Sequence, residues 1–329
     1  MATSNKPPVY VVVSALDAGH LTLPESHFVT DAEPGKRATV PSLSFLIQHA
    51  SPSRTKTTKL VFDLGVKRNL NGYTPAQRAH IAQRQPVIVV PDCADSLRNG
   101  NTDNSDTKEP PPLLDPATDI DLVILSHVHW DHVGTSSDFS SATVVVGAGT
   151  LDVLKNGAGP LYPAELFNDD ELPTSRTVEL PPLNLLGDIK TGSWTWQPLA
   201  GFDHVLDLFG DGSVYVIDSP GHLYGHVNLL ARISESKYVY LGGDCCHDPR
   251  ILSGEKGIAM YADGRGGMRS VHVDTDVAER TVDKVREFAA SVGPDHLRKG
   301  GDEVVVEVVV AHDGVWREKN RDRFWPGRL

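Results

Sequence analysis

Short runs of apolar, mostly β-branched residues recur along the whole chain and predict its strands. Several are continuously apolar rather than alternating, which is typical of strands that are buried on both faces. The predicted strands are VYVVVSAL, SLSFLIQH, KLVFDLG, DLVILSH, ATVVVG, GSVYVIDSPGH, HVNLLARI, KYVYLGGD and EVVVEVVVAHD. A chain with this many strands and few helical segments is expected to build at least one large sheet.

Two segments carry clear helix signals. Residues 274–293 have apolar positions near helical spacing, an Asp/Thr start and a glycine at the end. The segment that begins at Thr74 has Pro75 in its first turn, where proline is tolerated. We therefore expect helices in both places.

Two stretches are polar and rich in loop-forming residues. Residues 92–116 are rich in Asp, Asn and Pro, and residues 156–177 are equally irregular, so both predict long surface loops inserted between regular elements. No change in composition divides the chain. We expect a single domain over residues 1–329 that carries these two insertions.

The most informative stretch is SHVHWDHVG, which directly follows the apolar run IDLVIL. In an extended segment alternate side chains share a face, so His127, His129 and Asp131 can converge. The turn after the strand lets His132 approach from another angle. Imidazole and carboxylate groups bind zinc and related metals, but four of them do not easily fit one tetrahedral ion that keeps a position open. The motif therefore predicts two adjacent metal ions.

Further ligand-type residues follow later apolar runs. His222 stands in SPGH, Asp244 in GGD and His312 in AHD, each just past a predicted strand, where loops gather into functional sites. Isolated histidines near strand ends are more often structural. On that basis we expect no metal-binding role for three of them: His20, His27 and His49.

The ordered set HVHWDH, SPGH, GGD and AHD, with VFDLG upstream, resembles the metallo-β-lactamase-fold hydrolases over roughly residues 63–312. Within that superfamily the chain is most similar to the lactonase branch, which includes N-acyl homoserine lactone lactonases. The resemblance implies an α/β fold, the αββα sandwich, in which two mixed β-sheets pack face to face with helices outside. It also implies two Zn²⁺ ions per chain and no other cofactor.

The resemblance also implies a role for each ligand. The first metal is held by three residues: His127, His129 and His222. The second is held by three others: Asp131, His132 and His312. Asp244 bridges the two ions. Asp63 and His226 would orient ligands from behind, although Asp63 is equally consistent with a turn residue and His226 with a turn cap.

The implied chemistry is hydrolysis without a serine or cysteine nucleophile. Two dications lower the pKa of a shared water, and the hydroxide attacks a carbonyl group. Asp131 is a candidate for steering the proton of that hydroxide. Where the lactonase branch often has a tyrosine three residues after the bridging aspartate, this chain has His247. Its ring is a candidate hydrogen-bond donor to the developing oxyanion, with simple packing as the alternative.

We therefore predict a dinuclear metal-dependent hydrolase that opens a cyclic ester (lactone) or, next, a cyclic amide (lactam). A thioester hydrolase of the glyoxalase II type is the alternative enzyme, and it would need basic residues for an anionic thiol carrier. An iron-dependent sulfur dioxygenase, with one iron, is an alternative from another class. A non-catalytic binding module is least favoured, because no ligand is lost.

Composition and charge limit the kinds of partner and the compartment that can be expected. The net charge of -12 argues against nucleic acid, and no run approaches the about 18 apolar residues of a membrane span. A small-molecule substrate is expected, and the sequence carries no signal for an oligomeric state. Three cysteines are too few for a disulfide framework, which favours the reducing cytoplasm. Cys245 and Cys246 are expected to pack in the core.

Two further segments, one basic and one apolar, each allow two interpretations. The C-terminal WREKNRDRFWPGRL either packs its aromatic residues on the domain, which we favour, or clamps an anionic group of the substrate. Leu21 and Leu23 either wall the substrate pocket or pack internally.

Overall fold

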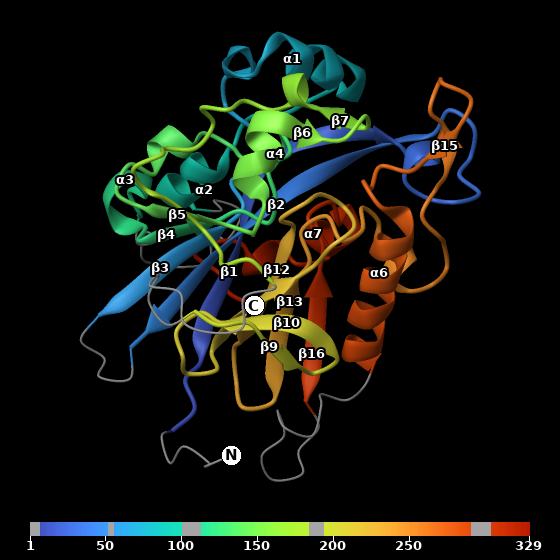
Figure 1. Ribbon diagram of the computed structural model, residues 1–329. Coiled ribbons are helices and arrows are strands. Elements are labelled where there is room, and N and C mark those ends of the chain that lie inside the picture. The colour runs from blue at the N-terminus through green and yellow to red at the C-terminus, as the bar shows by residue number, and fades with distance from the viewer. Residues whose placement is uncertain (1–6, 52–55, 101–112, 184–193, 291–303) are drawn as a thin grey trace.

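Two six-stranded sheets face each other in the computed structural model, which describes residues 7–51, 56–100, 113–183, 194–290 and 304–329 (Figure 1). The first sheet has the order β1 (Val11–Pro24), β2 (Arg37–Ala50), β3 (Thr57–Phe62), β4 (Leu122–Ile124), β5 (Thr143–Val146) and β8 (Thr177–Glu179). The second has the order β16 (Val305–Val309), β13 (Lys237–Leu241), β12 (Val227–Arg232), β11 (Val214–Asp218), β10 (Phe202–Asp207) and β9 (Gln197–Leu199). All nine predicted strands are confirmed.

The apolar runs are continuous because both faces of each sheet are buried. Successive side chains of a strand point to opposite faces. In β13, Val239 and Leu241 enter the core between the sheets, whereas Tyr238 and Tyr240 pack with Phe288 on the outer face. The result is a helix–sheet–sheet–helix order of layers, as predicted.

Both sheets mix parallel and antiparallel pairs, and this decides where the strand ends meet. Strands β3, β4, β5 and β8 are parallel neighbours, and β13 runs parallel to β16. Antiparallel pairs join β11 to β12 and β12 to β13, so β11 points the same way as β13. The segments that follow β4, β11, β13 and β16 are those that carry the predicted ligands.

Helices cover the outer faces. The two predicted helices are confirmed as α6 (Thr275–Ala290) on the second sheet and α1 (Pro75–Ile81), whose capping box joins Thr74 and Gln77. The remaining short elements are α3 (Pro116–Asp119), α4 (Thr150–Asn156), α5 (Pro249–Leu252), α7 (Gly314–Lys319), β6 (Gly157–Ala158), β7 (Tyr162–Pro163), β14 (Tyr261–Ala262) and β15 (Met268–Arg269). None of the helices in the described ranges has the length and apolarity needed to cross a membrane.

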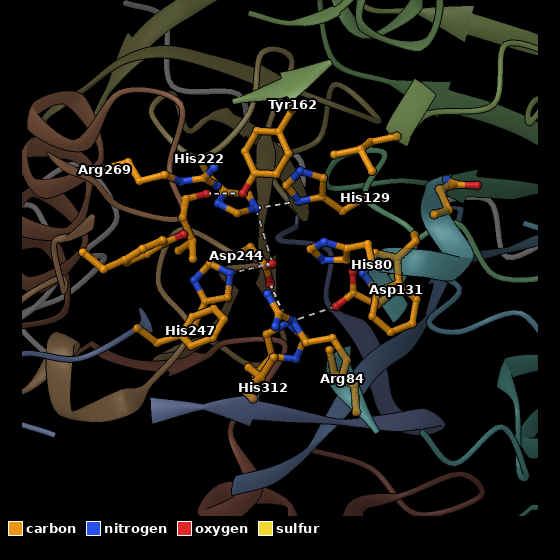
Figure 2. Close-up of a pocket in the computed structure, with 18 residues that line it drawn as sticks. His80, Arg84, His129, Asp131, Tyr162, His222, Asp244, His247, Arg269 and His312 are labelled. Atoms are coloured by element: carbon orange, nitrogen blue, oxygen red, sulfur yellow. Dashed lines mark hydrogen bonds and ion pairs between the residues drawn. The ribbon is translucent and has the colours of Figure 1, made fainter. Parts of the chain in front are cut away.

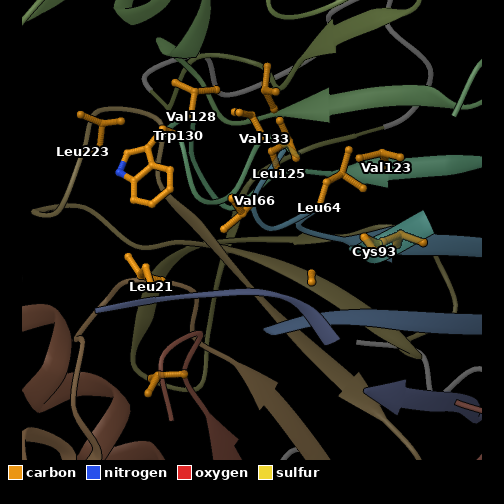
Figure 3. Packing of buried hydrophobic residues seen from close by; sticks show 14 of the residues in the cluster. Leu21, Leu64, Val66, Cys93, Val123, Leu125, Val128, Trp130, Val133 and Leu223 are labelled. Carbon is orange, nitrogen blue, oxygen red and sulfur yellow. The ribbon is translucent and has the colours of Figure 1, made fainter. Parts of the chain in front are cut away.

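The loop prediction for residues 92–116 is wrong in its first part. Helix α2 (Cys93–Asn99) lies there, and it buries Cys93 and Leu97 in a core cluster that includes residues of the first sheet. Figure 3 shows Cys93 within this cluster. The polar start of the helix looked like loop composition, but Asp92 and Asp95 form a capping box that satisfies the free N–H groups of the first turn. Residues 101–112 of the same prediction lie outside the described residues.

The second predicted insertion, residues 156–177, is largely irregular. Only the two-residue strands β6 and β7 and a 3-10 turn at Ala164–Leu166 interrupt it. Its importance is positional, since it brings Tyr162 to the ligand cluster described below.

The C-terminal segment packs on the domain, as we favoured. Trp316, Phe324 and Trp325 are buried, and the Trp325 N–H donates to the Ala15 carbonyl of β1. Arg317 pairs with the carboxylate of Asp17 at 2.6 Å, so this arginine is committed to holding the segment in place.

The turn after the histidine motif depends on a glycine, and Gly134→Ala is expected to lower the free energy of unfolding by about 2–3 kcal/mol. Gly134 has φ +47°, and a Cβ there would collide with the Leu64 backbone carbonyl. Denaturant unfolding of the metal-loaded protein measures the loss. Gly149→Ala is the control, because Gly149 has φ +91° but no atom within 4 Å of the added Cβ, so it should lose only about 1 kcal/mol. Equal losses would show that the collision does not matter.

Candidate metal centre

The seven predicted ligands meet at one edge of the two sheets. Figure 2 shows those that line the pocket: His129, Asp131, His222, Asp244 and His312. The seven ligands fall into groups whose donor atoms lie within 4.8 Å of one another, and all but His129 are buried. The seven residues are His127, His129, Asp131, His132, His222, Asp244 and His312. Residues up to 185 positions apart thus form one centre because their strand ends share an edge.

Three imidazole nitrogens form a tight triangle. The Nε2 of His127 lies 2.9 Å from Nδ1 of His129 and 3.2 Å from Nε2 of His222, and the last two atoms are 3.0 Å apart. Tetrahedral ligands about 2.0–2.1 Å from a zinc ion are themselves about 3.3 Å apart. The triangle therefore matches three ligands of one ion.

Asp244 places its two carboxylate oxygens on different sides. Oδ2 lies 3.4 Å from Nε2 of His222 and 3.7 Å from Nε2 of His127, so it faces the triangle. Oδ1 lies 3.2 Å from Nε2 of both His132 and His312. A carboxylate in this position can bind one ion with each oxygen.

The second group is completed by Asp131. Its Oδ2 lies 3.6 Å from Nε2 of His312, and with His132 these residues form a separate set of possible metal ligands. Each set alone supplies three donors besides Asp244. These two sets offer two neighbouring positions for metal ions. His247 and His272 belong to two further groups of possible ligands: His222, His247 and His272, and Asp244, His247 and His312.

The donor atoms fit metal ions better than they fit one another. Nε2 of His132 and Oδ1 of Asp244 are buried without a hydrogen-bond partner among the described residues. Such atoms are rare in proteins and usually mark a bound ion or a functional role. Burial lowers the pKa of His127, His129 and His222 well below the usual range, so these rings are neutral and keep a lone pair for a metal.

Outer contacts fix which nitrogen carries the proton. Nδ1 of His312 lies 2.8 Å from the Pro41 carbonyl oxygen, and Nδ1 of His132 lies 2.9 Å from Oδ2 of Asp63. A carbonyl oxygen and a carboxylate oxygen both accept hydrogen bonds, so Nδ1 of each histidine donates. Nε2 of His312 and Nε2 of His132 are then left free toward the centre.

Asp63 satisfies both interpretations made from the sequence. It has φ +58°, as a turn residue can, and it accepts hydrogen bonds from the N–H of Ser126 at 2.7 Å and the Ser126 hydroxyl at 2.8 Å. It therefore anchors the start of the histidine motif and orients His132.

His226 also acts from behind the ligands. Its Nε2 accepts the Asp244 backbone N–H at 3.1 Å, and its Nδ1 donates to the Ser219 carbonyl at the same distance. Burial, as the largest cause, lowers the pKa of His226 to about 3, which keeps the ring neutral. This ring holds the backbone of Asp244.

Two more histidines adjoin the centre. Nε2 of His247 lies 3.1 Å from Oδ2 of Asp244. His272, which the sequence analysis missed, lies with its Nδ1 3.2 Å from Nδ1 of His222. No local sequence pattern identifies His272. Backbone hydrogen bonds from Val273 to His222 and from Asp274 to Gly221 hold its segment beside the centre.

A pocket opens above the centre. Its volume is about 670 Å³, which includes space open to solvent. Leu21 and Leu23 are part of its wall, so their role in lining the pocket is confirmed. Other apolar or aromatic side chains complete the wall: Phe28, Trp130, Tyr162, Leu166, Tyr261 and Val271. Such a concave, mostly apolar space with a few convergent polar groups is typical of a small-molecule site.

The cysteines and three other histidines lie apart from the ligand groups. Cys245 and Cys246 are free and buried in the core, as expected, and Cys93 is buried there too. His49 pairs with Asp211 at 2.7 Å, and His27 stacks on Tyr261. These two and His20 lie outside the ligand groups found in the described ranges.

Known proteins are similar to this chain in sequence. The model of the metallo-beta-lactamase superfamily matches residues 104–242. The gamma-lactamase MBL2 of Gibberella moniliformis is 31% identical over 57% of this chain and 70% of its own length. The cytochrome P450 monooxygenase mpaDE of Penicillium brevicompactum is 28% identical over 97% of this chain, which spans only 35% of that relative.

A solved structure extends the likeness to the whole fold. An N-acyl homoserine lactone hydrolase, with the product N-hexanoyl-L-homoserine at its catalytic metal center, covers 98% of this chain and 100% of its own, with a TM-score of 0.60. At 16% identity this likeness concerns the fold. The matched family model, the gamma-lactamase relative and the shared fold show that the chain belongs to the metallo-β-lactamase superfamily of metal-dependent hydrolases.

Proposed function

We propose that this protein opens a cyclic ester or a cyclic amide with a hydroxide activated by two zinc ions. The observation that carries the proposal is Asp244, whose two oxygens face two separate sets of ligands. The names of the relatives support the substrate class, since they include a gamma-lactamase and a lactone hydrolase.

Each part of the centre has a task in this reaction. The first ion would be held by His127, His129 and His222, the second by Asp131, His132 and His312, and Asp244 would hold both. When bound, two zinc ions supply a hydroxide at neutral pH and stabilise negative charge on the carbonyl oxygen. Asp131, which lines the pocket, is placed to accept the proton of the attacking water at a carboxylate oxygen.

The chain itself orients the substrate and excludes water. His247 lines the pocket, and we assign its imidazole the donation of a hydrogen bond to the oxygen on which charge develops. The apolar wall suits a ring with few polar groups, and the buried floor limits access of bulk water.

The two alternative reactions have less support. A thioester hydrolase of the glyoxalase II type needs cationic groups for its thiol carrier, and the C-terminal segment does not supply them, because its Arg317 and Arg323 pair with Asp17 and Glu307. A sulfur dioxygenase needs a single iron, whereas the two oxygens of Asp244 face different sets of possible ligands.

Metal analysis with a substrate screen tests the proposal. We expect close to two metal ions per chain, with zinc predominant, and hydrolysis of lactones or lactams in preference to thioesters. Chelation should abolish turnover and lower the melting temperature, and added zinc should restore both. A single bound iron under saturating conditions, or turnover of thioesters alone, would refute the proposal.

We also propose a reducing compartment, the cytoplasm, as the place where the protein works. All three cysteines, Cys93, Cys245 and Cys246, are free and buried.

A further inference from the structure

Two arginines line the pocket without an acidic partner. Arg84 ends the 3-10 turn Ala82–Arg84 that follows α1, and Arg269 ends β15. Both are half-buried, and Figure 2 shows them on different sides of the pocket. Within the described parts of the chain, neither guanidinium lies within ion-pair distance of a carboxylate.

Two other arginines of this protein, in contrast, pair with carboxylates. Arg250 pairs with Asp248 at 2.7 Å and with Glu25 at 3.2 Å. Arg68 pairs with Asp92 at 2.7 Å and also with Asp138. A partly buried guanidinium is costly unless a negative group or several acceptors meet it, so two unpaired arginines in one pocket need an explanation.

Aromatic rings hold Arg269 in position. Its guanidinium carbon lies 5.4 Å from the ring centre of Tyr261 and 6.0 Å from that of Tyr162. Its Nε donates to the Ser270 carbonyl oxygen at 3.4 Å. A guanidinium placed against aromatic rings keeps its orientation while its terminal amino groups stay available to an acceptor.

The two charges act on the same space. Burial is the main reason why the pKa of His80 falls to about 4, and the positive charges of Arg84 and then Arg269 lower it further. His80 lines the pocket too, so it is neutral near pH 7 and the positive charge of this region belongs to the arginines. Burial also lowers the pKa of Arg84, as expected of a cation drawn into a pocket.

Nothing on the protein side of the pocket is free to neutralise this charge. Asp131 and Asp244 are its acidic lining residues, and both are assigned to the metal ions. A negative group must therefore come with the ligand.

We propose that Arg84 and Arg269, which line the pocket, bind a carboxylate carried by the substrate. The inference rests on the proposed function and narrows it to lactones or lactams that bear a carboxylate away from the ring bond that breaks. Guanidinium groups favour carboxylates because their N–H groups match both oxygens in one plane. Binding at this subsite would orient the ring over the metal ions.

The test uses matched lactones. γ-Lactones with a side chain of one to six methylene groups, ending in a carboxylate or in the uncharged carboxamide, are assayed with the zinc-loaded protein. At the best chain length we expect kcat/KM to favour the carboxylate by about 10- to 100-fold, the scale of a charge-assisted hydrogen bond. The preference should shrink as salt is raised.

Substitutions test whether the two arginines cause the preference for the carboxylate. Arg84→Gln and Arg269→Gln should each reduce the carboxylate-to-carboxamide ratio, mainly through KM, and the double variant should bring it near one. Arg265→Gln is the matched control, because Arg265 is an exposed arginine of the same β14–β15 hairpin that does not line the pocket, and its ratio should stay at the wild-type value. A wild-type ratio near one, or an unchanged ratio in the double variant, overturns the proposal.

A binding measurement separates this proposal from the proposed function. Calorimetry with glutarate, adipate and pimelate, each compared with its monoamide, isolates the contribution of a second carboxylate. Tighter binding of a diacid by tenfold or more, lost in the double variant with metal content unchanged, supports the subsite even if no lactone is hydrolysed. In that case only the assigned reaction fails. Equal affinities of diacid and monoamide at every length overturn the subsite whether or not lactones are opened.

Discussion

Asp244→Asn is expected to lower turnover at least about 100-fold and to reduce the occupancy of one metal position. Oδ1 of Asp244 lies 3.2 Å from both His132 and His312, and Oδ2 faces the triangle of the first group. An asparagine keeps the shape of the side chain but loses its negative charge. Its amide nitrogen cannot bind a metal ion, so only one ligand atom remains. Two cations so close together would then repel each other with less compensation.

Elemental analysis, steady-state kinetics and thermal unfolding of the variant measure these effects. Asp248→Asn is the control, since Asp248 lies on the same segment but pairs with Arg250 at 2.7 Å. That control should keep its metal content. Wild-type turnover of Asp244→Asn with both metal ions retained would refute the bridging role.

His247→Ala is expected to keep both metal ions and to lower kcat by about 10²–10³, the usual effect of losing a transition-state hydrogen-bond donor. The ring lines the pocket, and its Nε2 is within 3.1 Å of Oδ2 of Asp244. The proximity to the bridge makes metal content the decisive control. Loss of metal would place His247 in the ligand set, and unchanged kinetics would make it a packing residue against Phe28, whose ring centre is 4.9 Å away.

A second substitution separates donation from packing. His247→Tyr retains an aromatic ring and a hydrogen-bond donor, so it should recover part of the kcat lost in the alanine variant. His247→Phe retains the ring without the donor and should remain as slow as alanine. Equal recovery by both aromatic residues would contradict a donor role and favour packing.

Strands and ligands were predictable where the signal is local. The runs of β3, β4, β13 and β16 are apolar on both faces because each sheet is covered on both sides, so their composition alone reveals them. The histidine motif and the later ligands each follow such a run directly. Their order along the chain was enough to indicate the superfamily, before any distance was known.

Local signals failed where an element is short or capped by polar residues. Helix α2 has only seven residues, and its capping aspartates resemble a loop, so its helical character depends on Cys93 and Leu97 packing in the core. Strand β10 has the sequence FDHVLD, which is neither a continuous apolar run nor an alternation of apolar and polar residues, so it was not predicted. Its pairing with β11 supplies the hydrogen bonds that stabilise it.

The sequence by itself determined the strands, because the hydrophobic period is a property of neighbouring residues. Its ordered motifs indicated the superfamily, the layered fold and the candidate metal ligands through their resemblance to known hydrolases. The tertiary structure alone decided which oxygen of Asp244 faces which ligands, and it brought His272 and two unpaired arginines, Arg84 and Arg269, to the pocket. These residues stand on short segments without periodicity. Their roles arise from contacts between distant parts of the chain, which only the packing of the two sheets and their loops creates.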